Sequence, residues 1–331
     1  MKIVVDGYGG DNAPAAILDG VKAALIADPA LEVVVTGKEE EMSLYIKGET
    51  FGGRLTLANA PSVISCEDTP TLAIRTKKDS SLVVALDLVA SGEADGLVSA
   101  GSTGAVLVGA TLKIGRIRGV ERPALAPALP TVKGGNVILC DCGANVDCKP
   151  SYLVGFARMA AAYQRGVFGV TEPRVGLLNN GAESTKGNAF SLEAYKLLSE
   201  CAEIRFVGNV EARDILSGDV DVVVADGFDG NIALKSAEGT ANAVFSLLKQ
   251  EIYTSFRAKL GALLLKPAFK KLKKKVDFNE HGGAAFLGVK KPVVKAHGAS
   301  KARSILGAIL QVRDMIAGGV CDMVRVEKDD E

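Results

Sequence analysis

The sequence predicts an α/β protein with a doubly wound, mostly parallel sheet. Short β-branched runs alternate with longer helical patterns along the chain. Most of the short runs are continuously apolar, as in parallel strands that helices cover on both faces. Glycine is abundant, with 37 residues among 331, and aromatic residues make up only 5%. Small side chains of this kind favour close packing of helices against a sheet.

Eight segments have the composition of strands, and six longer segments have that of helices. The expected strands are Lys2–Val5, Glu32–Thr36, Arg54–Ala58, Gly96–Ser99, Asn136–Asp141, Arg174–Leu178, Ile204–Val207 and Val220–Ala225. The expected helices are Ala15–Asp28, Thr71–Ala90, Tyr152–Arg165, Asn188–Ser199, Ser236–Leu260 and Ser300–Ala317. Strands and helices that alternate in this order predict a parallel sheet.

The whole chain, residues 1–331, is expected to form a single α/β domain. Residues 236–278 are expected to protrude from it as a helical, basic and amphipathic element that serves a membrane or a dimer. The first helix of this element carries an apolar stripe, which is more often a core or dimer face than a chemical site. The stripe consists of Val244, Leu248, Ile252, Phe256 and Leu260.

The balance of charge excludes some classes of function. The chain has 39 Lys and Arg against 39 Asp and Glu, whereas domains that bind nucleic acid are usually basic. The apolar run before Asp6 is too short for a secretory signal, and no stretch approaches the ~20 apolar residues of a membrane span. We therefore expect a cytoplasmic protein that does not bind nucleic acid.

The six cysteines do not indicate a disulfide framework, because they are scattered through a long chain. Cys140, Cys142 and Cys148 cluster, but they have no nearby histidine and lack the paired spacing of a zinc site. They are typical of small, reduced residues at the end of a strand. No metal is expected.

Two segments of the chain resemble each other. Ser91–Leu107 and Ser217–Ala233 both read as Ser-Gly, a carboxylate, an apolar residue, Asp, an apolar run and Gly-x-x-Gly. Open α/β sheets bind ligands beyond the carboxyl ends of their strands, so the two glycine-rich loops are expected to face one crevice. The simpler alternative is two independent units with common loop chemistry.

The first candidate loop for phosphate follows the first expected strand. Its adjacent glycines let backbone amides approach an anion, and Asn12 can cap the helix that follows Pro14. The candidate residues of this loop are Gly9, Gly10, Asp11 and Asn12.

The second candidate loop contains Ser102, Thr103 and Gly104. It leads from a buried strand into an apolar helix, where backbone amides and two hydroxyls can meet an anion at a positive helix end. The loop lacks the Lys of a Walker motif, so a nucleoside triphosphate site is not expected. An ordinary capped turn is the alternative.

Three further residues are candidates for catalysis: Lys186, Asn231 and His297. Lys186 lies in a polar loop after a strand, where it can deliver a cation to a phosphate or a developing oxyanion. Asn231 is expected to open a helix, where its amide can cap the helix or donate to a substrate oxygen. His297 precedes a glycine just ahead of a helix, but no hydrolase triad can be assembled.

A basic, amphipathic segment covers residues 261–278. Leu and Phe beside clustered Lys are typical of contact with a membrane surface, where anionic lipid attracts each Lys by ~1 kcal/mol. The residues expected to touch the membrane are Leu263, Leu264, Leu265, Lys270, Lys271 and Lys274. An acidic protein partner or a solvated helix face are the alternatives.

Seven motifs, specific only in combination, carry a resemblance to a known family. They are Gly9–Pro14, Ser99–Ala105, Arg122–Ala124, Asp141–Asn145, Gly181–Asn188, Ala225–Asn231 and Lys295–Ser300. Through them nearly the whole chain resembles the PlsX-type phosphate acyltransferases of bacterial phospholipid synthesis. Tyr8 departs from the family, which usually has Met there, but the change removes no expected catalytic group.

The resemblance implies a transferase that converts acyl-[acyl carrier protein] and inorganic phosphate into acyl phosphate and free carrier protein. The product would feed glycerol-3-phosphate acylation by a downstream acyltransferase. The resemblance also implies a fold like those of isocitrate and isopropylmalate dehydrogenases and phosphate acetyltransferase. It implies a homodimer, reversible membrane contact and no cofactor. Lys186 and Asn231 are the implied catalytic residues, with His297 a weaker third.

The candidate residues suit this chemistry. Phosphate is already an anionic nucleophile at neutral pH, and a thiol with a pKa of ~8.5 leaves without much protonation, so no strong base is needed. The site must supply anion binding, alignment and stabilisation of an oxyanion. Basic surface at Arg116, Arg118 or Lys266–Lys275 could receive an acidic carrier protein. Two alternatives remain: a phosphate acetyltransferase that uses acetyl-coenzyme A, and a non-catalytic scaffold on a lipid surface.

Overall fold

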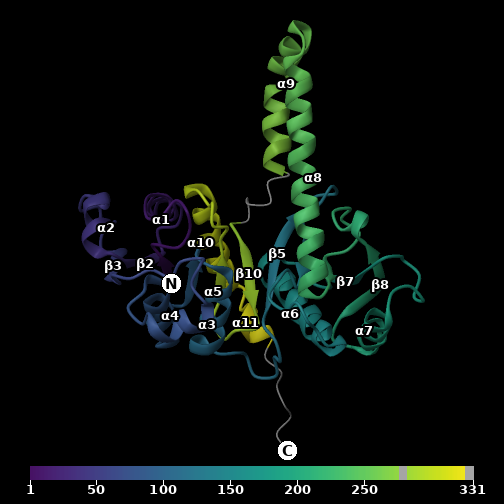
Figure 1. Ribbon diagram of the computed structural model, residues 1–331, viewed down its shortest axis with the longest axis horizontal. Helices are drawn as coiled ribbons and strands as arrows, with labels where there is room; N and C mark the ends of the chain where they lie inside the picture. The colour runs from purple at the N-terminus through teal and green to yellow at the C-terminus, as the bar shows by residue number, and fades with distance from the viewer. Residues whose placement is uncertain (276–281, 325–331) are drawn as a thin grey trace, which may run out of the picture.

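The computed structural model describes residues 1–275 and 282–324, which form an α/β fold around one mostly parallel sheet (Figure 1). Within these residues the sheet has eleven strands in the order β3-β2-β1-β4-β11-β10-β5-β6-β9-β7-β8. The strands are β1 Lys2–Asp6, β2 Glu32–Gly37, β3 Leu55–Asn59, β4 Gly96–Ser99, β5 Ala124–Pro130, β6 Asn136–Cys140, β7 Arg174–Asn179, β8 Arg205–Glu211, β9 Val222–Val224, β10 Ala284–Leu287 and β11 Val293–Lys295. The predicted fold class is confirmed.

Helices cover both faces of the sheet. The α-helices are α1 Ala15–Ala27, α2 Glu39–Ile46, α3 Pro70–Thr76, α4 Ser81–Ala90, α5 Thr103–Gly109, α6 Pro150–Phe168, α7 Ala189–Glu200, α8 Gly227–Tyr253, α9 Phe256–Lys275, α10 Ala302–Ala317 and α11 Val320–Met323. A π-helical turn, η1 (Ala110–Ile114), continues α5, and a 3₁₀ turn, η2 (Ala212–Asp214), follows β8. One core cluster joins the sheet to α1, α2, α6, α7 and α10, and a second joins it to α4, α5 and η1.

Three strands and two helices of the structure, α2 and α11, were absent from the expected elements. Strand β5 contains Pro127 and Pro130, which in sequence argue against a strand. Strands β10 and β11 are only four and three residues long; besides pairing with each other, they pair with β5 and β4, which lie far away in the chain. Five of the eight residues of helix α2 are exposed, and helix α11 has only four residues. Local pattern alone does not reveal elements of this kind.

The expected helix Thr71–Ala90 is wrong, because the chain forms two helices there. Helix α3 ends at Thr76, and α4 begins at Ser81 after a turn. The side chain of Ser80 accepts a hydrogen bond from Val83 N at 3.4 Å, so it caps α4 and fixes the break.

The two antiparallel strands β10 and β5 lie in the centre of the sheet, between two groups of parallel strands. Strands β1 to β4 and β11 run one way, whereas β6, β7, β8 and β9 run the other way. One row of paired residues crosses the sheet at the level where β4 ends, and the next row reaches β9. The first row is Ser99, Lys295, Ala284 and Pro127; the second is Ala128, Ile138 and Val222. Val222 is the first residue of β9, which ends at Val224, so β9 ends about one residue from the level of Ser99 although it runs opposite to β4.

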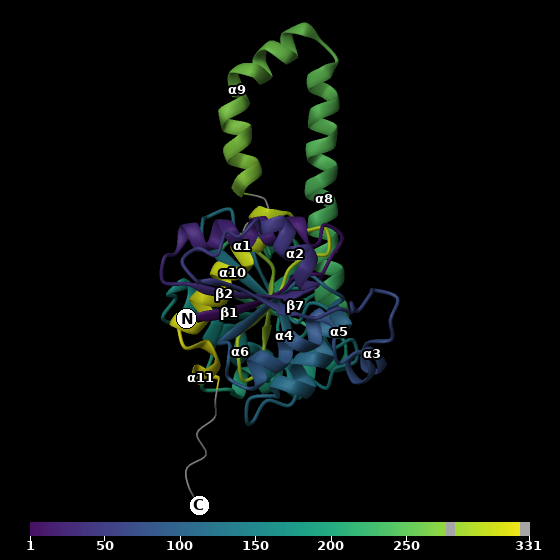
Figure 2. The same ribbon diagram turned by 90° about the vertical axis from the view of Figure 1, so that its left-hand side faces the viewer.

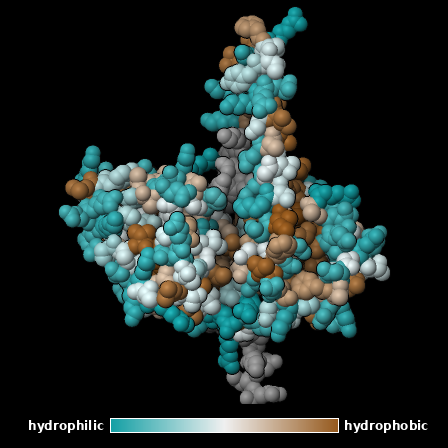
Figure 3. All heavy atoms as spheres, in the orientation of Figure 1, coloured by the Kyte–Doolittle hydropathy of each residue, from teal (hydrophilic) through white to brown (hydrophobic). Residues whose placement is uncertain are grey.

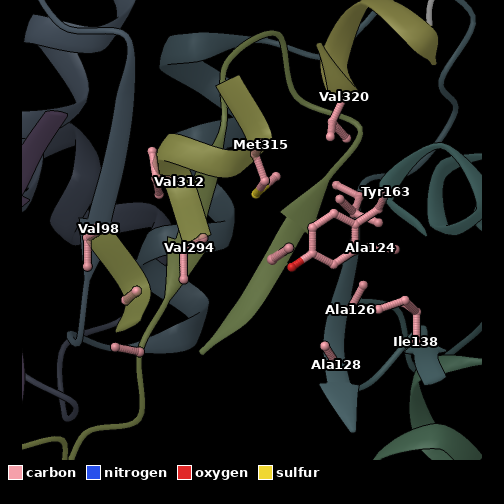
Figure 4. Close-up of a cluster of buried hydrophobic side chains, with 14 of the residues drawn as sticks. Val98, Ala124, Ala126, Ala128, Ile138, Tyr163, Val294, Val312, Met315 and Val320 are labelled. Atoms are coloured by element: carbon pink, nitrogen blue, oxygen red, sulfur yellow. The ribbon is translucent and has the colours of Figure 1, made fainter. Parts of the chain in front are cut away.

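Small side chains along β5 make room for large ones from the helices. Ala124, Ala126 and Ala128 are fully or almost fully buried there, beside the ring of Tyr163 from α6 (Figure 4). The Tyr163 hydroxyl accepts a hydrogen bond from Gln311 Nε2 of α10 at 2.7 Å. This contact ties α6 to α10 under the central strands.

Helices α8 and α9 form a hairpin that projects from the body of the molecule (Figures 1 and 2). Helix α8 begins at Gly227, nine residues before the expected start at Ser236, and its base packs against β6. Helix α9 carries Pro267 inside it. Of the element expected at residues 236–278, the last three residues lie outside the described part of the chain.

Candidate active site

Three loops that are distant in sequence meet at one end of β1, β4 and β11. A Cβ built on Gly9 would lie 2.6 Å from Gly101 N and 2.7 Å from Asp6 Oδ2, so only glycine allows this approach. Asp11 N donates a hydrogen bond to the Gly298 carbonyl at 2.8 Å. The first candidate phosphate loop therefore lies between the second loop and the His297 segment.

Asn12 does not cap α1, contrary to expectation. The residue before α1 is Pro14, and no side chain caps that helix. Instead, Asn12 Nδ2 donates hydrogen bonds to the carbonyls of Ala299 and Ser300, each at 3.2 Å. A tertiary contact with residues nearly 290 positions away replaces the local one, and it holds two loops together.

Ser99 organises the second candidate loop. Its hydroxyl donates to Asp6 Oδ2 at 2.7 Å and accepts from Gly101 N at 3.0 Å. Burial raises the pKa of the Asp6 carboxyl, while hydrogen bonds to it oppose this. The hydroxyls of Ser102 and Thr103, at the start of α5, make no hydrogen bond within the described residues, so they can serve a ligand.

Lys295 is a buried cation at this junction. It is only 9% exposed, and its side chain borders a small void together with Thr103 and Ala144. Burial lowers the pKa of Lys295 to about 8. In the sequence, His297 stands out in this segment and Lys295 does not, because a lysine usually lies on the surface.

The turn after β6 joins these loops to the start of α8. Asp141 accepts hydrogen bonds from Leu125 N at 2.8 Å and Asn145 N at 2.6 Å. A Cβ on Gly143 would lie 3.8 Å from side-chain atoms of Asn231. Because Ala144 borders the void beside Lys295, the turn lies between the two halves of the site.

Asn231 is not the residue that opens α8, so the expected capping role is wrong. Asp226 caps the helix, since its Oδ1 accepts from Phe228 N at 2.9 Å and Asp229 N at 2.8 Å. Asn231 is exposed one turn further on. Its amide makes no hydrogen bond in the part of the chain that the structure describes, and it can therefore donate to a substrate.

Lys186 lies on a loop whose backbone accepts hydrogen bonds from two asparagines, Asn179 and Asn209. Neither asparagine was among the expected site residues. Asn179 Nδ2 donates to the Lys186 carbonyl at 3.2 Å, and Asn209 Nδ2 donates to the Glu183 carbonyl at 2.7 Å. Asn179 Nδ2 also donates to Asn209 Oδ1 at 3.1 Å. Asn209 is 9% exposed. The sequence signal that could have identified Asn209 is a polar residue among Phe206, Val207 and Val210 of the same strand.

A large pocket adjoins both candidate catalytic segments. Its volume is about 950 Å³. Gly187 and Asn188, next to Lys186, border it on one side, and Asp229 and Ile232, on either side of Asn231, border it on the other. Its deeper lining is apolar and includes Leu129, Leu139, Leu153, Leu177, Leu178, Ile215 and Leu216.

His297 lies with the first group of loops and is exposed. Its Nδ1 accepts a hydrogen bond from Ala299 N at 3.1 Å, which leaves Nε2 to face solvent or a ligand. His281, the other histidine, lies outside the described residues.

The cysteine cluster is mainly part of the core. Cys140 and Cys142 are buried, and burial raises the pKa of each thiol well above its usual value. Residues 1–275 and 282–324 contain no group of three or more His, Cys, Asp or Glu side chains placed to hold a metal.

The projecting hairpin exposes the apolar residues expected to touch a membrane. Leu263, Leu264 and Leu265 are 64%, 76% and 53% exposed, and apolar side chains are visible along the hairpin in Figure 3. Lys270 and Lys271 are exposed, whereas the side chain of Lys274 lies outside the description. Tyr253 and Phe256, at the turn between the helices, are exposed too, but they were not among the residues expected to touch a membrane. No described helix is long and apolar enough to span a membrane.

Comparisons with known proteins show the family to which this chain belongs. A family model described as "Fatty acid synthesis protein" matches residues 1–323. The phosphate acyltransferase of Bacillus licheniformis is 47% identical over 324 residues, which cover 98% of this chain and 97% of that protein.

Solved structures show the same fold at low identity. A phosphotransacetylase from Streptococcus pyogenes has a TM-score of 0.63 at 18% identity, covering 96% of this chain and 94% of its own. A putative 4-hydroxythreonine-4-phosphate dehydrogenase from Salmonella typhimurium has a TM-score of 0.53 at 13% identity, with 95% and 99% covered. These likenesses confirm the expected dehydrogenase-like fold.

Proposed function

Because this chain belongs to the fatty acid synthesis protein family and is a phosphate acyltransferase, we propose that its acyl donor is a long-chain acyl-[acyl carrier protein]. The products are acyl phosphate and free carrier protein. The acyl phosphate then serves a downstream glycerol-3-phosphate acyltransferase in phospholipid synthesis. Family membership makes the chain an enzyme, so the alternative of a non-catalytic scaffold is dropped.

The apolar pocket beside Lys186 and Asn231 is the observation that carries this proposal. Its volume of about 950 Å³ is in the range of sites that enclose large ligands, and leucines line its depth. An acetyl group would leave almost all of this apolar surface uncovered. The pocket therefore favours a long acyl chain over acetyl-coenzyme A as the donor.

The proposed reaction is a displacement at the thioester carbonyl. A phosphate oxygen forms a bond to the carbonyl carbon, and the C–S bond then breaks. The thiolate leaves and takes a proton from water. Lys186 and Asn231 donate to the oxyanion that forms on the carbonyl oxygen, where such donors act most strongly. His297 is a third and weaker candidate, because it lies with the opposite group of loops.

Phosphate is proposed to bind where the first and second loops meet. The hydroxyls of Ser102 and Thr103 and the first amides of α5, including Gly104, supply donors there. Gly9 and Gly10 permit the close approach of the backbone. Asp11 N and the Asn12 amide already hold the His297 segment, so their part is to shape the site.

The chain is proposed to act as one catalytic unit that works at a membrane surface, as a homodimer. Exposed Leu and Lys residues of α9 support peripheral attachment of a cytoplasmic enzyme. Exposed apolar residues on α8 support contact with a second copy; they include Val244, Leu247 and Leu248. Basic residues on α9 or at Arg116 and Arg118 can receive the acidic carrier protein.

The decisive assay measures release of carrier-protein thiol from a long-chain acyl thioester, with and without inorganic phosphate. We expect release only with phosphate, and acetyl-coenzyme A to be a poor donor in the same assay. Ala237→Phe, which fills the pocket, should shift the preference toward shorter acyl chains. Ala202→Phe, at an exposed position outside the pocket, is the control. Equal use of acetyl-coenzyme A by the unmodified enzyme would show that the proposal is wrong.

A further inference from the structure

Lys295 is a buried cation that no other part of the site explains. It ends β11, level with Ser99 where β4 ends. The one hydrogen bond of its ammonium within the described residues goes to the adjacent Ala296 carbonyl. An ammonium has three donors, so two remain. No carboxylate among those residues lies within ion-pair distance of it.

A buried lysine without an ion pair is costly for a fold, because burial removes the water that stabilises its charge. An apolar side chain of similar length would fill the same space at lower cost. The charge is therefore better explained by a ligand than by folding. Lys295 borders a void of about 10 Å³, which is no larger than one water, so the residue is closely packed.

Three groups act on the charge of the ammonium: Cys66, Asp6 and Asp11. Asp6 ends β1 and Asp11 lies in the first candidate phosphate loop, so two of the three belong to segments that meet at the site. Thr103, whose hydroxyl is unused within the described residues, borders the same void. A small anion at the start of α5 would thus meet a hydroxyl, backbone amides and one cation.

We propose that Lys295 binds the inorganic phosphate substrate and aligns it for attack on the thioester. This assignment rests on the proposed function, in which phosphate is the nucleophile, and it makes the Lys295 ammonium the cation that binds this phosphate. It also divides the work of the two lysines, because Lys186 comes from the other group of loops and acts on the carbonyl oxygen. Lys295 thereby supplies charge to the nucleophile, and Lys186 supplies it to the electrophile.

The test measures binding of inorganic phosphate without any acyl donor, from the rise in unfolding temperature of the full chain with phosphate concentration. Lys295→Met should weaken phosphate binding by about 10- to 100-fold, the effect of losing a hydrogen bond to a charged group. Lys290→Met, an exposed lysine just ahead of the same strand, should leave binding unchanged. If Lys295→Met does not fold, Lys295→Gln gives the same readout.

The pH dependence gives a second readout. Lys295 is charged below its pKa of about 8, so its contribution to phosphate binding is present below that pH and lost as pH rises through it. Lys295→Met should lack this loss. Cys66→Ser should keep it, which separates the lysine from the thiol that faces it.

Two results would overturn the inference: no effect of phosphate on the unmodified chain, or equal phosphate binding by Lys295→Met. Coenzyme A, which carries phosphate esters, forms a further arm, and its effect on unfolding should not depend on Lys295. If it does, Lys295 serves the donor and the inference is wrong. Absence of thioester turnover in the unmodified enzyme would instead refute the proposed function, while phosphate binding that depends on Lys295 would still stand.

Discussion

At the scale of single residues, Lys186 is the side chain whose removal separates chemistry from folding. It is exposed, and its loop is held through backbone carbonyls; within residues 1–275 and 282–324 its ammonium makes no hydrogen bond or ion pair that could support the fold. We expect Lys186→Ala to lower the rate of phosphate-dependent thiol release by ~10²-fold or more, because one donor to the oxyanion is lost.

The unfolding temperature of Lys186→Ala should equal that of the unmodified enzyme. The matched control is Lys196→Ala, which should keep full activity. Lys196 is an exposed lysine on α7, the helix that follows the Lys186 loop. An active Lys186→Ala enzyme would remove Lys186 from the mechanism.

At the scale of elements, the ends of β7 and β8 position the Lys186 loop. Asn209 is a buried donor to the Glu183 carbonyl, and Asn209→Asp keeps its size while replacing that donor by an acceptor. We expect kcat to fall about 10-fold, as for the loss of one hydrogen bond at a buried site. Asn242→Asp, exposed on α8, is the control.

A double mutant decides whether Asn209 acts through Lys186. If Asn209 only positions that lysine, Asn209→Asp should cost nothing further in a Lys186→Ala background, because the two changes remove one interaction. If the two reductions in kcat multiply in the double mutant, Asn209 acts independently of Lys186, which would contradict this role.

At the scale of the whole molecule, the proposed membrane contact lies on the α8–α9 hairpin, which projects from the body. Phe256 and Leu264 are 81% and 76% exposed on it, and burying each side chain in lipid contributes about 1.5–3 kcal/mol. Phe256→Ser combined with Leu264→Ser should abolish flotation with anionic vesicles and leave turnover of carrier-protein substrate intact. High salt should weaken flotation of the unmodified enzyme, because the Lys contribution is screened.

The control for flotation is Leu44→Ser. Leu44 is 74% exposed on α2, on the body of the molecule and away from the hairpin (Figure 1). The Leu44→Ser enzyme should float with anionic vesicles as the unmodified enzyme does. Flotation of the hairpin double mutant would show that another surface meets the lipid.

Local pattern was enough to predict the outer strands of each half and most helices. Apolar runs such as residues 2–6 and 222–224 are buried on both faces, and their composition reports this directly. The glycine-rich loops and Lys186 could also be found, since their residue types are unusual after a buried strand. Asp226 shows the limit at helix starts, because several polar residues competed to be the cap and only the backbone geometry selects one.

The sequence by itself determined the α/β class, the repeated loop units and the basic amphipathic segment, because each depends on neighbours in the chain. Only the tertiary structure decided that β5, with its two prolines, lies in the centre of the sheet, and that β10 and β11 pair beside it. It also decided that Lys295 is buried and that Asn209 supports the Lys186 loop. Burial and pairing of this kind come from contacts between residues distant in sequence, and the spacing of apolar residues within a short segment does not reveal such contacts.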